Sequence, residues 1–302
     1  MKITNRFNVP ETLLALASRD DYTKGKADYS VTEIISPPRI QRLRRKHWDD
    51  MEQDVSDMLW SLMGSALHVV AERSQVENHV TEERLMTSFG AVTLSGAIDL
   101  QKIVDGKVRI TDYKFTSAWA LRADKFEWTA QQNIYAFLVR ECKGLEVEGI
   151  QICALIRDWS RRDAQYKADY PPAPIQVVDL PLWDHEKTRA YIEERIALHN
   201  DAKAHADWGE ELPECTDEER WIRTSTYAVK KEGRKTAIRV FESKEEADNL
   251  AKKENGYVEF RPGEPIRCTG NFCGVSKWCS QYLQEGAGSD AGSGVRAEGG
   301  QE

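Results

Sequence analysis

Two strand-like segments with charged ends constrain the fold of this chain more than any other feature of its sequence. Residues 92–100 (VTLSGAIDL) and 108–115 (VRITDYKF) are short and rich in apolar residues, and an Asp-Gly turn signal lies between them. Side chains two residues apart in a strand share a face, so Asp112 and Lys114 point the same way. A short hairpin would also bring Asp99, near the end of the first segment, beside Asp112. The pattern predicts a sheet on which two carboxylates and a lysine gather at one point.

Such a group has a specific chemical use. Two carboxylates at close range repel and raise one another's pKa unless a cation lies between them, and a hard divalent cation with oxygen ligands removes that conflict. Phosphodiester hydrolysis needs such a cation, and Lys114 could then orient water or stabilise developing negative charge. The alternative is a plain ion pair at the end of a strand, because Asp-x-Lys is common by chance.

Three more residues extend this group. His68 lies one turn after Gly64 in a segment with helical periodicity, and an imidazole beside carboxylates suits Mn²⁺. Gln131 and Tyr135 lie one turn apart in a second predicted helix. The Gln131 amide could hydrogen-bond a phosphate and a catalytic lysine, and Tyr135 could stack on a base or contact a phosphate. A lone helical histidine is otherwise a satisfied core or surface residue.

Together these motifs resemble those of RecB-like nucleases of the PD-(D/E)XK superfamily. The series is Gly64-x-x-x-His68, Gly96-Ala97-Ile98-Asp99, Asp112-Tyr113-Lys114 and Gln131-x-x-x-Tyr135. The resemblance implies that His68, Asp99, Asp112 and the Tyr113 carbonyl ligate Mg²⁺ or Mn²⁺. It implies that Lys114 is catalytic together with Asp99, Asp112 and Gln131, and that Gln131 and Tyr135 contact DNA. It also implies an α/β fold, with a restriction-endonuclease-like core whose central mixed sheet is flanked by helices.

Four of the six cysteines fall late in the chain, at Cys215, Cys268, Cys273 and Cys279. Many RecB-like nucleases hold a [4Fe–4S] cluster with one cysteine before the histidine motif and three near the C-terminus, the last two separated by five residues. Cys273 and Cys279 match that spacing, but no cysteine precedes His68, so Cys215 would have to be the fourth ligand. Four thiolates also suit zinc, and three unrelated thiols are the remaining alternative.

The chain divides into four predicted parts. Residues 1–215 form the nuclease core, and residues 216–262 form a small inserted α+β module with the order strand, strand, helix, strand. Residues 263–283 are a cysteine-containing segment that docks on the core. Residues 284–302 are rich in glycine and almost lack large apolar residues, so we expect a disordered tail.

Net charge is −8, which does not indicate a nucleic-acid binder, but two local runs are basic. Residues 39–46 contain five Lys or Arg, and residues 220–239 contain seven against one acid. The default interpretation is a solvated face. If the chain is a nuclease, both runs become candidate phosphate contacts. The predicted DNA-binding residues of the second run are Lys230, Lys231, Arg234 and Lys235.

The sequence therefore predicts a metal-dependent deoxyribonuclease, with exonuclease activity favoured by the resemblance. The alternatives are a structure-specific endonuclease on the same scaffold and a non-catalytic DNA-binding recombination scaffold. We expect DNA as the partner, with a recombinase or a single-strand-binding protein as candidate helpers. The first residues lack the apolar stretch of a signal peptide, and no apolar run is long enough to cross a membrane. These features predict a cytoplasmic protein of a bacterium or a phage-infected cell, with no membrane partner.

Overall fold

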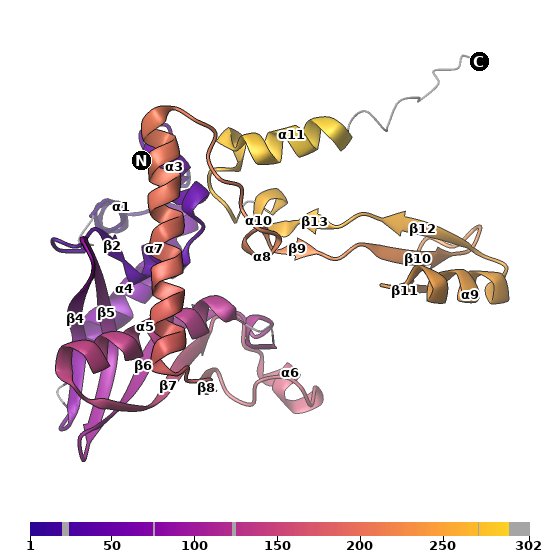
Figure 1. The fold of residues 1–302 in the computed structure, drawn as a ribbon. Coiled ribbons are helices and arrows are strands. Elements are labelled where there is room, and N and C mark those ends of the chain that lie inside the picture. The colour runs from indigo at the N-terminus through magenta and orange to yellow at the C-terminus, as the bar shows by residue number, and fades with distance from the viewer. Residues whose placement is uncertain (20–23, 75, 123–124, 271, 290–302) are drawn as a thin grey trace. The chain divides into compact units, whose positions relative to one another are not determined.

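The chain forms two units. The computed structural model describes residues 1–19, 24–74, 76–122, 125–270 and 272–289 (Figure 1). The first unit comprises Met1–Ser36 and His47–Ala204, and the second comprises Pro37–Lys46 and the chain from His205 onward. This division differs from the predicted boundary at residue 215. An N-terminal helix joins the second unit because one of its arginines is buried against C-terminal residues.

A six-stranded mixed sheet forms the centre of the first unit. Its strands are β2 (Tyr29–Ser30), β4 (His79–Phe89), β5 (Val92–Val104), β6 (Lys107–Thr116), β7 (Glu146–Ile156) and β8 (Ile175–Leu180). The long strand β5 pairs with β4 on one side, and with β2 and β6 on the other. The β5–β6 and β7–β8 pairs are antiparallel, whereas β6 and β7 are parallel. The predicted hairpin is therefore present, at the middle of the sheet.

Helices pack against this sheet. Those of the first unit are α1 (Glu11–Ala17), α2 (Val31–Ile35), α4 (Leu59–Glu72), α5 (Phe126–Lys143), α6 (Arg161–Tyr166) and α7 (His185–Trp208). Two short 3-10 turns, η1 (Val55–Met58) and η2 (Ala120–Arg122), precede α4 and α5. A small parallel pair joins β1 (Lys2–Thr4) to β3 (Glu52–Asp54). The arrangement confirms the predicted α/β class with a central mixed sheet flanked by helices.

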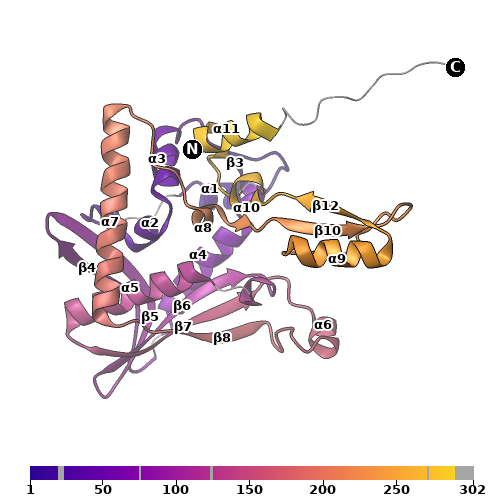
Figure 2. The same ribbon diagram turned by 45° about the vertical axis from the view of Figure 1, so that its right-hand side comes forward.

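Helix α5 makes the crossover that parallel strands require, because it connects β6 to β7. It lies across the strands (Figures 1 and 2) and buries Ile134, Phe137 and Leu138 in the main hydrophobic core. The helix ends at Gly144, whose left-handed backbone (φ 63°) closes the last turn. Every side chain from Thr129 to Val139 is buried. Helix α5 is therefore a rigid support for the side chains at the ends of the adjacent strands.

The second unit is built from short elements. They are α3 (Pro38–Lys46), α8 (Asp217–Arg220), β9 (Ile222–Arg223), β10 (Thr226–Lys230), β11 (Arg239–Phe241), α9 (Lys244–Glu254), β12 (Tyr257–Arg261), β13 (Glu264–Pro265), α10 (Ile266–Thr269), the 3-10 turn η3 (Ser276–Trp278) and α11 (Ser280–Ser289). Strands β10, β11 and β12 form an antiparallel sheet in the order β11-β10-β12, and α9 packs on it around Val229. This part matches the predicted order of strand, strand, helix, strand.

Two expectations for the second unit need correction. Helix α11 continues to Ser289, so the residues just after 283 are helical instead of a tail. The Gln281 side chain bonds to the backbone of Cys215, and Glu285 pairs with Arg220, which fixes the first turns of α11. Residues 290–302 lie outside the described part. The basic run at 39–46 is α3, and its first arginine, Arg39, is only 2% exposed, which removes it as a phosphate contact.

Candidate metal centre

The β5–β6 hairpin brings together the two carboxylates that the sequence singled out. Leu100 pairs with Thr111 across the hairpin, so Asp99 and Asp112 are neighbours one step further along. The Asp99 carboxylate accepts a hydrogen bond from the backbone N–H of Tyr113 (2.9 Å). This bond fixes the carboxylate of one strand against the backbone of the other, where Asp112 is also located.

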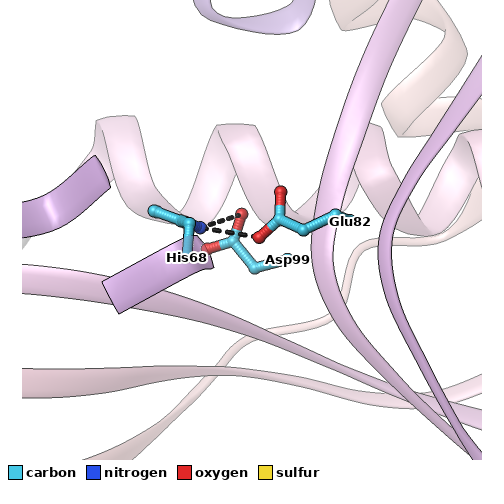
Figure 3. Close-up of side chains that lie close together, drawn as sticks. All are labelled: His68, Glu82 and Asp99. Atoms are coloured by element: carbon cyan, nitrogen blue, oxygen red, sulfur yellow. Dashed lines mark hydrogen bonds and ion pairs between the residues drawn. The ribbon is translucent and has the colours of Figure 1, made fainter. Parts of the chain in front are cut away.

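His68 reaches the same point from helix α4. Its Nδ1 lies 2.8 Å from a carboxylate oxygen of Glu82 and 3.7 Å from one of Asp99 (Figure 3). The hydrogen bond with Glu82 raises the pKa of His68 above its ordinary value. The three side chains offer one nitrogen and two oxygens within 4.8 Å of one another, and no other such group of three His, Cys, Asp or Glu ligands occurs in the described residues.

Glu82 is the residue that sequence reasoning missed. It lies in β4 between the pairs Thr81–Leu100 and Glu83–Ile98, so the register puts it opposite Asp99. Its backbone is left-handed (φ 52°), an uncommon conformation for a residue with a side chain. The strand-like run in this part of the sequence, residues 83–89, begins one residue after Glu82. A longer strand paired through the Gly90 turn would have placed it opposite Asp99.

The electrostatics of this group favour a cation. Burial, and then the charge of Asp112, raise the pKa of Asp99 from 3.8 to about 7. The Lys114 ammonium pairs with Oδ2 of Asp112 at 2.8 Å, and Asp112 is only 2% exposed. Two buried carboxylates on neighbouring strands, with one ammonium beside them, fit the ligands of a divalent metal.

Helix α5 contributes Gln131 and Tyr135, but not at the surface. The Gln131 amide donates a hydrogen bond to the Tyr135 hydroxyl (2.9 Å), and both residues are buried. The Tyr135 ring lies so close to Gly96 that a Cβ there would be 2.9 Å from it. Gly96 is thus needed for close packing of α5 on β5. The burial argues against base stacking by Tyr135, because its ring belongs to the main core.

The four late cysteines line one small cavity in the second unit, together with Arg39, Arg220 and Arg267. Cys273 and Cys279 are buried. Burial is also the main cause of the raised pKa of Cys215, which reaches about 12. All four cysteines are in the described part of the chain, and no three of their sulfurs lie within 4.8 Å of one another. Zinc would need them about 3.8 Å apart, given Zn–S bonds of about 2.3 Å.

The predicted DNA-binding lysines and arginine differ in their surroundings. Lys230 is bound to Glu259, with 2.5 Å between nitrogen and oxygen. Lys231, Arg234 and Lys235 are exposed in the loop between β10 and β11. Three of the four predicted DNA contacts are therefore available to a ligand, whereas Lys230 is already paired with Glu259.

These observations define a class of protein with buried acidic ligands beside a lysine on a mixed sheet. The chain belongs to the PD-(D/E)XK nuclease superfamily, whose family profile matches residues 13–280. Nucleases of this superfamily generally use divalent metals, and the acidic group described above fits that use. No helix of the described residues is long and apolar enough to cross a membrane.

Two solved structures are among those similar to this chain. One is the crystal structure of SSO0001, which is 16% identical, with 62% of this chain and 82% of that chain covered and a TM-score of 0.40. The other is a protein from Eubacterium rectale described as a candidate exonuclease, which is 9% identical, with 66% and 73% covered and a TM-score of 0.28. No curated protein matches the chain. The assignment rests on the family match alone.

Proposed function

We propose that this protein is a metal-dependent deoxyribonuclease that acts from DNA ends. The observation that carries the proposal is the buried pair Asp99 and Asp112, in which the charge of Asp112 helps to raise the pKa of Asp99, directly beside Lys114. A purely structural ion pair would not require a second buried carboxylate beside it, or the His68–Glu82 pair in contact with it. The family match supports nuclease chemistry at this group of residues.

The residues divide into metal ligands and a positively charged partner. Glu82, Asp99, Asp112, His68 and the Tyr113 carbonyl would hold Mg²⁺ or Mn²⁺, which activates water for attack on phosphorus when it is bound. The Lys114 side chain is 27% exposed, so its ammonium can reach a phosphate oxygen and stabilise the negative charge that develops there. Gln131 and Tyr135 act as positioning residues, because Gln131 bonds to Tyr135 and the Tyr135 ring packs closely on Gly96 of β5, the strand that carries Asp99.

The experiment that tests this proposal compares linear and covalently closed circular DNA of the same sequence, with Mn²⁺ or with EDTA. We expect metal-dependent loss of the linear DNA, while the closed circle is spared. Efficient linearisation of the circle would favour the alternative, a structure-specific endonuclease. Tight DNA binding with no cleavage under any divalent metal would favour the non-catalytic recombination scaffold.

A second DNA contact is proposed at the loop between β10 and β11. Lys231, Arg234 and Lys235 place three positive charges together on a chain with net charge −8, and the only acid in the loop is Glu232. Tyr257, which pairs with Lys230 in the register, is 52% exposed at the same end of this sheet. Basic side chains beside an exposed aromatic ring suit a single strand, whose phosphates and bases need these two contacts.

The cysteines are proposed to hold a [4Fe–4S] cluster. Four thiols line the cavity, which is the number of cysteine ligands that a [4Fe–4S] cluster takes. Protein purified without oxygen should be brown and carry about four iron atoms per chain. A colourless preparation with one zinc per chain, or with no metal, would contradict this assignment.

We also propose that the nuclease works with a recombinase or a single-strand-binding protein, in recombination or phage DNA processing.

A further inference from the structure

Two buried arginines contact sulfur atoms of the cysteine cavity. Arg39, in α3, is 2% exposed, and its Nε donates a hydrogen bond to Sγ of Cys279 (3.2 Å). Arg220, at the end of α8, is 6% exposed and donates a hydrogen bond to Cys268. Two different helices therefore each direct a guanidinium at a different one of the four sulfurs.

Both arginines also bind an acid that is partly exposed. Arg39 pairs with Glu211, and it donates hydrogen bonds to Ser280 and to the Leu212 carbonyl. Arg220 pairs with Glu285. In Arg39 both terminal nitrogens are taken by these partners, which leaves Nε as the donor to sulfur.

A hydrogen bond to a neutral thiol would stabilise a buried guanidinium only weakly. Sulfur of an S–H group is a weak acceptor, whereas a thiolate that carries charge is a strong one, and hydrogen bonds to charged groups are about twice as strong as neutral ones. The other two cysteines are held differently. The backbone N–H and carbonyl of Cys215 bond to the Gln281 side chain, and Cys273 accepts from the backbone N–H of Val275. Cys279 and Cys268 thus receive a cationic donor from Arg39 and Arg220.

We propose that Arg39 and Arg220 are outer hydrogen-bond donors to the cluster, and that they stabilise its more negative, one-electron-reduced state through Cys279 and Cys268. The inference rests on the proposed [4Fe–4S] cluster and goes beyond it, since it assigns two residues that are not ligands. Hydrogen bonds to the sulfurs and nearby charge are the means by which a protein sets the reduction potential of such a cluster. Loss of one donor should lower the equilibrium constant for reduction about tenfold, or about 59 mV for one electron.

The test uses the full chain purified without oxygen, in the wild type and in Arg39→Gln and Arg220→Gln. Iron content is measured first, and the reduction equilibrium is then titrated with mediator dyes and followed by absorbance and electron paramagnetic resonance. Arg45→Gln is the matched control, because Arg45 lies on the same helix α3 but is exposed. We expect the control to change the equilibrium less than twofold.

The outcomes separate the inference from the cluster itself. A wild-type protein without iron would overturn the cluster and this inference together. Iron-loaded Arg39→Gln and Arg220→Gln proteins with wild-type potentials would overturn the inference alone. If Arg39→Gln does not fold, Arg220→Gln decides the result, and Arg39→Lys keeps the charge while removing the Nε–H donor. Loss of iron from a variant whose circular dichroism spectrum stays native would show that this arginine contacts the cluster, and the reduction potential of the other arginine's variant would then decide the inference.

Discussion

The carboxylate group of the first unit and the cysteine cavity of the second differ in the ligand atoms that they offer. The first gathers His68, Glu82 and Asp99, with Asp112 paired to Lys114 on the next strand, so most of its ligand atoms are carboxylate oxygens. The second gathers four thiols with three arginines and Glu219, and other acids pair with two of those arginines. Carboxylate oxygens suit a hard divalent cation, whereas thiolates suit an iron–sulfur cluster or zinc. Ligand chemistry therefore predicts different occupants for the two sites.

The largest expected effect is on cleavage. Asp112→Asn and Lys114→Ala should each reduce turnover at saturating DNA at least about a hundredfold, because a metal ligand or a charge stabiliser is lost. Asp105→Asn is the matched control, since Asp105 occupies the turn of the same hairpin in a left-handed conformation that asparagine tolerates. Turnover near that of the wild type in folded Asp112→Asn would show that the carboxylate group is not the catalytic site.

A second prediction separates Glu82 from its neighbour. Glu82→Gln should weaken Mn²⁺ binding about 10- to 100-fold in isothermal titration, because it removes a carboxylate that contacts His68. Glu83→Gln should leave Mn²⁺ affinity unchanged and instead lower thermal stability, since Glu83 binds Lys143 and Gln101. Equal Mn²⁺ affinities of the two variants would show that Glu82 is not a ligand of the metal.

A third prediction concerns the loop between β10 and β11. Reversal of Lys231, Arg234 and Lys235 to glutamate should weaken single-strand binding about tenfold at low salt and flatten the dependence of affinity on salt. Lys244, Lys252 and Lys253, reversed together on α9 of the same small module, are the charge-matched control. Fluorescence anisotropy across a salt series provides the measurement. If the affinities of the two variants depend on salt in the same way, the loop is a solvated surface that does not contact DNA.

The smallest expected effect is on stability as a function of pH. The folded protein binds a proton at Asp99 up to about pH 7, whereas the unfolded chain releases it near 3.8. Between these values the native state binds more protons, so the free energy of unfolding of metal-free protein should fall as pH rises through 7. The raised pKa of His68 acts in the same direction. Thermal melts from pH 5 to 8 should show a decline of a few degrees, which Asp99→Asn reduces. A rise in the melting temperature over this range would contradict the electrostatic description.

Most of the first unit could be predicted from the sequence. Its strands and long helices have clear periodicity, and the hairpin of β5 and β6 follows from two apolar segments and one turn. Asp99, Asp112 and Lys114 were found because they are on adjacent strands, where register depends on local sequence. Local patterns report local structure, so they were sufficient for this part of the site.

Tertiary structure decided what lies far apart in the sequence or departs from regular pairing. The left-handed backbone at Glu82 interrupts the strand pattern, so its carboxylate was recognised only when β4 paired with β5. Arg39 seemed to be part of a solvated basic run, yet it is buried against Cys279, 240 residues away. Charge and periodicity along a chain cannot show which side chains are desolvated together, because desolvation depends on how distant segments pack.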